Sequence, residues 1–146
     1  MKRRIKHVTV LGSGIMGSGI AAHFANIGVE VLLLDIVPFE LTEAEQKKGL
    51  TKEDKAVRNR IATESLAKLV KASPALLYKK EFAERISVGN FDDDLQKIKN
   101  TDWIIEVVVE RLDIKKSVYE KIEQFRKPGT LVSSNTSGIP INMLVE

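Results

Sequence analysis

In the first forty residues, the spacing of apolar positions changes twice, from a pattern typical of a strand to one typical of a helix and back again. A β-branched run from Ile5 to Leu11 predicts a buried strand. Large apolar residues then recur at helical spacing up to Gly28, which is typical of a helix end: Ile15, Met16, Ile20, Phe24 and Ile27. The continuous apolar run from Val29 to Val37 predicts a second strand, covered on both faces. This order is typical of a right-handed βαβ unit.

The middle of the chain is less regular. The stretch from Leu41 to Lys80 is charged and favours helix, and an apolar stripe along it predicts one or two surface helices: Ile61, Leu66, Leu69 and Val70. Ile86 to Val88 predicts a third strand. The acidic turn from Asp92 to Asp94 is typical of a helix N-terminus and lacks the glycine and glutamate of a calcium loop.

The last third of the chain returns to alternation. We expect a strand from Trp103 to Val109, an amphipathic helix from Asp113 to Phe125, a strand from Thr130 to Ser133 and the start of a helix at residues 141–146. No internal repeat or linker composition interrupts the chain. The pattern therefore predicts a single α/β domain over residues 1–146, with a doubly wound, mostly parallel sheet of the Rossmann type and helices on both faces.

The turn between the first strand and the first helix carries the strongest chemical signal. It is a G-x-G-x-x-G sequence formed by Gly12, Ser13, Gly14, Ile15, Met16 and Gly17. In such a turn the first glycine permits the tight bend and the second lets a pyrophosphate approach the backbone. The third lets the helix pack closely on the sheet, and free N–H groups at the helix N-terminus face the phosphates. The motif predicts a dinucleotide site.

Asp35 supports this reading because it ends the second strand, at the spacing expected for an acid that binds the adenosine ribose. Ile36, Val37 and Pro38 follow it, with no cation to bind a 2′-phosphate, so we expect NAD rather than NADP. The alternative is that the glycines only make a tight turn and that Asp35 is a surface acid.

The composition and charge of the chain argue against several classes of site and of binding partner. The chain has no cysteine and only two histidines, His7 and His23, so disulfides and a His- or Cys-based metal site are not expected. Its net charge of +3 is too small to indicate nucleic acid. The basic start and the apolar run up to Ala22 resemble a signal peptide, but glycines and serines dilute the run. We expect a cytoplasmic protein with no membrane span, and we attribute the Asn135-Thr136-Ser137 glycosylation match to chance.

With these motifs in place, the sequence resembles the NAD-binding domain of L-3-hydroxyacyl-CoA dehydrogenases. The resemblance rests on GSGIMGSGIAA from Gly12, on Asp35, on WIIEVVVERLDIK from Trp103, and on the Ser134-Asn135-Thr136-Ser137 segment. It covers the chain from residue 5 onward and is weakest over residues 38–64. Such enzymes oxidise 3-hydroxyacyl-CoA to 3-ketoacyl-CoA in fatty-acid β-oxidation.

The resemblance assigns roles to four further residues. It implies that Glu110 and Lys115 contact the nicotinamide end of the cofactor, that Ser137 lies between the nicotinamide and the substrate hydroxyl, and that Ser65 touches acyl-CoA. Each has a structural alternative. Glu110 and Lys115 could be a helix-start acid and a solvated lysine, Ser137 could be an N-cap, and Ser65 could be a plain helix-surface residue, which we favour.

The family's catalytic histidine, which follows the S-N-T-S segment and is oriented by a glutamate, has no counterpart here, nor has the helical domain that completes the acyl-CoA site and the homodimer. Neither His7 nor His23 is placed to reach the nicotinamide. We therefore expect the cofactor-binding part of a longer enzyme, which binds NAD without turnover. Two alternatives are the NAD-binding domain of a related hydroxyacid dehydrogenase and a non-catalytic, NAD-responsive binding module.

Overall fold

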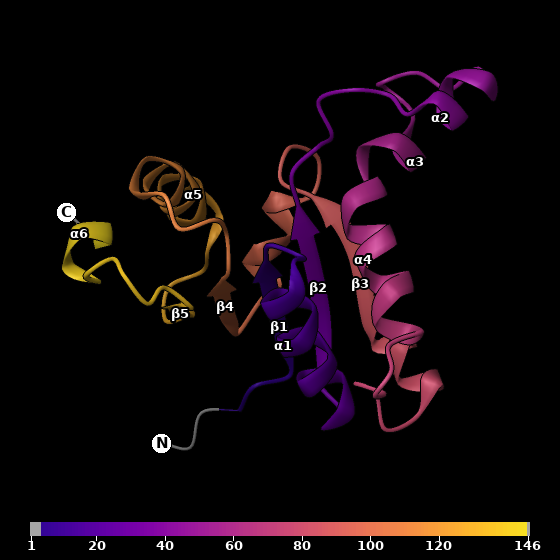
Figure 1. Cartoon of the computed structure of the whole chain (residues 1–146). Coiled ribbons are helices and arrows are strands. Elements are labelled where there is room, and N and C mark those ends of the chain that lie inside the picture. Colours follow the sequence, from indigo (N-terminus) through magenta and orange to yellow (C-terminus); the bar gives the residue numbers. More distant parts are fainter. Residues whose placement is uncertain (1–3, 146) are drawn as a thin grey trace.

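The computed structural model describes residues 4–145 and contains one five-stranded parallel sheet (Figure 1). Its strands are His7–Leu11 (β1), Glu30–Asp35 (β2), Ile86–Asn90 (β3), Trp103–Glu106 (β4) and Leu131–Ser134 (β5). They lie in the order β3-β2-β1-β4-β5, and all four neighbouring pairs are parallel. The predicted doubly wound sheet is confirmed. Residues 1–3 of the signal-like start, and Glu146 of the last predicted helix, lie outside the described residues.

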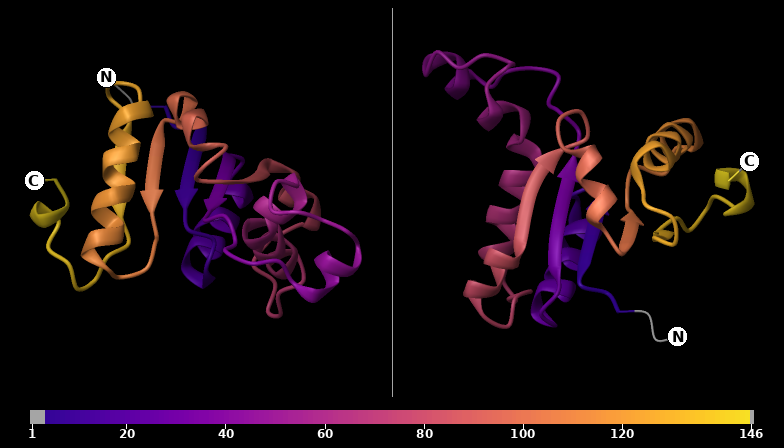
Figure 2. Two further views of the ribbon diagram at one scale, coloured as in Figure 1. Left: turned by 90° about the horizontal axis from the view of Figure 1, so that it is seen from above. Right: turned by 180° about the vertical axis from the view of Figure 1, so that it is seen from behind.

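Helices cover both faces of the sheet (Figure 2). They are Ile15–Asn26 (α1), Glu43–Lys47 (α2), Lys55–Arg58 (α3), Arg60–Val70 (α4), Leu112–Phe125 (α5) and Asn142–Val145 (α6), with 3₁₀ turns at Lys80–Arg85 (η1) and Leu95–Asn100 (η2). Within residues 4–145, no helix combines the length and the apolar character needed to cross a membrane.

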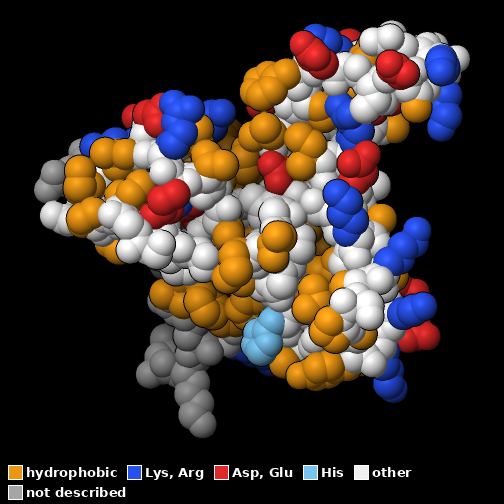
Figure 3. Space-filling view, viewed as in Figure 1, with side chains coloured by type: hydrophobic (Ala, Val, Ile, Leu, Met, Phe, Trp, Pro, Cys, Tyr) orange, Lys and Arg blue, Asp and Glu red, His pale blue; other side chains and the backbone are white. Residues whose placement is uncertain are grey.

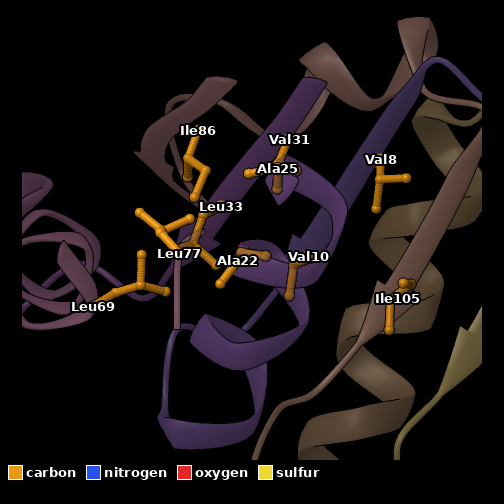
Figure 4. Close-up of a cluster of buried hydrophobic side chains, with 11 residues drawn as sticks. Val8, Val10, Ala22, Ala25, Val31, Leu33, Leu69, Leu77, Ile86 and Ile105 are labelled. Carbon is orange, nitrogen blue, oxygen red and sulfur yellow. The ribbon is translucent and has the colours of Figure 1, made fainter. Parts of the chain in front are cut away.

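Two apolar clusters lie on opposite faces of the sheet, because successive strand residues point to opposite sides. One cluster packs beneath α1 and α4 and is drawn in Figure 4, where the labelled members are Val8, Val10, Ala22, Ala25, Val31, Leu33, Leu69, Leu77, Ile86 and Ile105. The other packs beneath η2 and α5: Leu11, Leu34, Leu95, Ile98, Ile104, Val118 and Ile122. Alternate positions of β1 and β2 therefore contribute to different clusters.

Two strands are shorter than their apolar runs predict. β2 ends at Asp35 rather than Val37, and β4 ends at Glu106 rather than Val109. Both strands end close to where their partners end. Glu106 faces Leu11, the last residue of β1. Leu34 also faces Leu11, and β2 continues for one more residue because Asp35 pairs with Asn90, the last residue of β3.

The region predicted to hold one or two helices contains three, α2, α3 and α4. α2 is a single short helix bounded at its start by a reciprocal capping box between Thr42 and Glu45. It is followed by Gly49, whose φ of +72° is a left-handed conformation that favours glycine. The capping box and Gly49 therefore separate a short helix from the rest of the charged stretch, which the apolar stripe alone does not indicate.

α1 packs on the sheet through its smallest residues rather than through its large apolar ones. Its buried residues are Gly17, Ser18, Ala21, Ala22 and Ala25. Ile15 and Ile27, whose spacing predicted the helix, are exposed. A Cβ on Gly17 would lie 1.8 Å from the carbonyl oxygen of Gly12, so the helix approaches the turn closely enough to exclude any side chain there.

We expect Gly17→Ala to destabilise the domain by about 2–4 kcal/mol, because its methyl group would push α1 away from the turn. Gly19→Ala is the matched control. It lies in the same helix and has open space around its Cβ position, so it should add about 0.5–1 kcal/mol of helix propensity. Urea unfolding followed by circular dichroism measures both, and equal loss in the two variants would contradict the close contact.

Candidate functional site

Most of the candidate site residues gather at one edge of the sheet, because they lie at or just after the carboxyl ends of parallel strands. The Gly12–Gly17 turn follows β1, Asp35 ends β2, Glu110 lies in the loop after β4, and Ser137 lies in the loop after β5. A ligand that crosses this edge can therefore reach residues from four strands.

The first turn leaves an open cradle above α1. Gly12 has a φ of +110°, and a Cβ on it would lie 2.6 Å from the carbonyl oxygen of Val107. Gly14, by contrast, has no atom within 4 Å of its Cβ position, so a ligand has room beside the backbone. No side chain caps α1, and its first turn carries no acid. Its first N–H groups, which have no partner within the helix, are free to bind phosphate oxygens.

Ser13 connects Asp35 to the Gly12–Gly17 turn, which is the candidate phosphate-binding turn (the phosphate turn). The backbone N–H and the hydroxyl of Ser13 both donate to Asp35 Oδ2 at 2.6 Å, and Ile36 N–H donates to Oδ1 at 2.7 Å. Ser65 of α4 joins this group, since its Oγ lies 3.0 Å from Ser13 Oγ. Asp35 remains half-buried and not fully enclosed, so its carboxylate can still meet a ribose. These positions fit the adenosine and pyrophosphate of NAD.

A groove of about 520 Å³ begins next to Asp35 and is lined by Ile36, Pro38, Phe39 and Arg60. Arg60 is a cation that the sequence did not connect with this site, because it lies on a distant helix. Its guanidinium is already engaged: Nη2 donates to the carbonyl oxygen of Glu40 at 2.7 Å, and Nε lies 3.2 Å from Glu45 Oε1.

Ile15 and Met16 lie on the open side of the turn. Ile15 is 93% exposed, and both residues line an apolar hollow of about 380 Å³ with Trp103 and Ile105. Figure 3 shows apolar side chains gathered on the face of the molecule that α1 presents in Figure 1. This hollow extends from the turn along the α1 side of the sheet to Trp103, the first residue of β4.

Glu110 holds the loop after β5 in place. Its Oε1 accepts hydrogen bonds from the Thr136 hydroxyl, from Ser137 N–H at 3.2 Å and from Gly138 N–H at 2.9 Å. These donors, the Thr136 hydroxyl above all, lower the pKa of Glu110 to about 2. Ser137 itself is exposed at the rim of the site.

Glu106 is not among the candidate residues that the sequence indicates, yet it lies fully buried at the end of β4, 2.8 Å from Lys115 Nζ. Lys115 is only 1% exposed and also lies 3.4 Å from Glu110 Oε2. A signal was present, since Glu106 is the one polar residue in an apolar run.

Several structural alternatives are settled by position. Lys115 is buried, so the solvated-lysine reading is wrong. α6 begins at Asn142, so Ser137 is not its N-cap. Ser65 contacts the phosphate turn and is not a plain surface residue. His7 lies at the amino end of β1 and His23 is exposed on α1. In the described part of the chain, no three His, Asp or Glu side chains converge as a metal site would require.

We expect the Glu110 carboxyl to titrate near pH 2, and Thr136→Val to raise that pKa by removing its main donor. Because the pKa in the folded chain lies below the ordinary 4.5, the contact with residues 136–138 stabilises the fold above that pH. It is lost as the pH falls towards 2. Carboxyl ¹³C NMR measures the pKa. Thr63→Val, an exposed change on α4, is the control and should leave it unchanged.

Comparison with known proteins places this geometry in a family. Residues 7–146 match the family model of the 3-hydroxyacyl-CoA dehydrogenase, NAD binding domain. A probable 3-hydroxyacyl-CoA dehydrogenase of Bacillus subtilis (strain 168) is 52% identical over 146 residues, which are 100% of this chain and 18% of the relative. A probable 3-hydroxyacyl-CoA dehydrogenase of Deinococcus radiodurans is 41% identical over 143 residues, 98% of this chain and 37% of the relative.

Among solved structures, the (S)-3-hydroxybutyryl-CoA dehydrogenase of Ralstonia eutropha aligns with a TM-score of 0.64 and 29% identity, over 97% of this chain and 44% of that one. The chain thus spans less than half the length of each of these three relatives. Sequence, fold and the arrangement of the first turn agree: the chain belongs to the 3-hydroxyacyl-CoA dehydrogenase family and matches its NAD-binding domain.

Proposed function

We propose that this chain binds NAD across the carboxyl edge of the sheet, as part of an enzyme that oxidises L-3-hydroxyacyl-CoA to 3-ketoacyl-CoA. The observation that carries the proposal is the joint placement of the open α1 N-terminus, the Asp35 carboxylate and the loop held by Glu110. When bound, NAD supplies a nicotinamide ring that accepts hydride. The chain's own residues bind the phosphates, accept hydrogen bonds from the ribose and place Ser137 beside the ring.

The remaining parts of the reaction belong to the whole enzyme. We propose an acyl-CoA substrate with a contact at Ser65, whose hydroxyl lies beside the phosphate turn. Ser137, on the rim, is our candidate for contact with the substrate hydroxyl. We also propose a homodimer in the complete enzyme and a cytoplasmic location, where NAD and CoA esters are both available. The support is membership of the family together with the bacterial relatives.

We expect the chain to bind NAD more tightly than NADP, because Asp35 would repel a 2′-phosphate at the ribose. Asp35→Ala should weaken NAD binding by about 10- to 100-fold, the value of hydrogen bonds to a charged group. Isothermal titration with both cofactors measures this. Glu84→Ala, at the opposite end of the sheet, is the control. Equal affinity of the unaltered chain for NAD and NADP would refute the assignment of Asp35.

We expect the chain alone to bind NADH without reducing acetoacetyl-CoA. Proton transfer needs a base near the substrate oxygen, and His7 and His23 both lie away from the Glu110 and Ser137 loops. The decrease of NADH absorbance with acetoacetyl-CoA measures turnover, and fluorescence titration of NADH measures binding in the same sample. Steady turnover by the chain itself would contradict this division of roles.

A further inference from the structure

Glu106 is a buried charge that no role in cofactor binding accounts for. It is the last residue of β4 and is 0% exposed, on the sheet face that α5 covers. A carboxylate in such a place is costly unless it is paired and hydrogen-bonded. Since Glu106 is sealed from the surface, it cannot touch a ligand directly.

Both carboxylate oxygens of Glu106 accept hydrogen bonds, and the donors lie in different elements. Oε1 accepts from Lys115 Nζ of α5 and from Val108 N–H of the following loop, both at 2.8 Å. Oε2 accepts from the Ser134 hydroxyl at the end of β5. Ser134 Oγ in turn accepts from Thr136 N–H at 3.1 Å. Glu106 therefore connects the loop after β4 with the loop after β5.

Lys115 extends this connection to Glu110. Its ammonium lies between the carboxylates of Glu106 and Glu110 and also donates to the carbonyl oxygen of Val108 at 3.3 Å. Two carboxylates share one cation, so the cluster carries one net negative charge. Lys115 contacts Glu110 through Oε2, which leaves Oε1 for Thr136, Ser137 and Gly138.

The negative charge of Glu106 holds Lys115 in a position that leaves Glu110 bound to the loop after β5. If its charge were removed, Glu110 would be the remaining carboxylate beside the buried ammonium, and Lys115 would draw it inward. Glu110 would then leave the N–H groups of Ser137 and Gly138, and the loop after β5 would lose its anchor.

We propose that Glu106 is a positioning residue for the nicotinamide end of the cofactor, acting through Lys115, Glu110 and Ser134. It fixes the separation of the two loops between which the ring is received. This inference rests on the proposed function, since it assigns the nicotinamide to these loops. Lys115 links the two carboxylates, because its buried ammonium contacts both Glu106 and Glu110.

The test compares two ligands on the intact chain. NAD has a nicotinamide, whereas ADP-ribose contains only the part that Asp35 and the phosphate turn would bind. We expect Glu106→Gln to weaken NAD binding about tenfold, the value of one charge-assisted contact, and to leave ADP-ribose affinity unchanged. Isothermal titration gives both dissociation constants, and circular dichroism checks that the variant is folded.

A milder variant keeps the test valid if Glu106→Gln fails to fold. Ser134→Ala breaks the link from Glu106 to the loop after β5 without leaving a buried cation unpaired, and it should show the same selective loss. Ser133→Ala is the matched control. It is the neighbouring serine on β5, and its hydroxyl accepts from Trp103 Nε1 instead of donating to Glu106. It should leave both affinities unchanged.

The outcomes separate the two proposals. Selective loss of NAD affinity in Glu106→Gln or Ser134→Ala supports the positioning role. Parallel loss of both ligands in a folded variant overturns it, as does equal affinity of the unaltered chain for NAD and ADP-ribose, because the loops would then hold no nicotinamide. If the unaltered chain binds neither ligand, the proposed function itself fails.

Discussion

The close approach of Gly17 to the carbonyl oxygen of Gly12 determines how the first half of the site, at the ends of β1 and β2, is built. It draws the N-terminus of α1 directly over the end of β1. Ser13 then lies close enough to bind Asp35, and the N–H groups of the first helical turn open towards the space beside Gly14. The small residues along the rest of α1 maintain the same distance from the sheet. A larger residue at Gly17 would displace all of these groups together.

The two halves of the site are held by different physics. Around Asp35, one carboxylate accepts hydrogen bonds from Ser13 and Ile36, and the cradle depends on backbone shape. At the other half, one ammonium is shared between two carboxylates beneath two loops. A buried ion pair contributes little net stability compared with apolar residues of the same size. Here the ion pair positions the two loops, because its fixed charges hold segments that are not part of a helix or strand.

Much of the fold could be predicted from the sequence because each strand and helix has a distinct spacing of apolar residues and is ended by a glycine, a proline or a polar turn. The order of elements, the glycine turn and Asp35 follow from local pattern. The ends of β2 and β4 do not, since they depend on where the neighbouring strand stops. The buried state of Lys115 could not be inferred either, because a lysine in an amphipathic helix is usually solvated, and only three-dimensional pairing with Glu106 reverses that expectation. Arg60 was missed for a similar reason: it lines the groove beside Ile36 only after α4 has folded against the sheet.

The strand order also has a consequence for how the chain assembles during synthesis. Of the five strands, β1 is translated first and lies in the centre of the sheet. β2 and then β3 add on one side of it, and β4 and then β5 add on the other, so every new strand joins an edge that is already present. No strand has to be inserted between two that have paired. A parallel sheet pairs residues far apart in the chain and is slow to form. This order lets each stage begin as soon as the next strand has been translated.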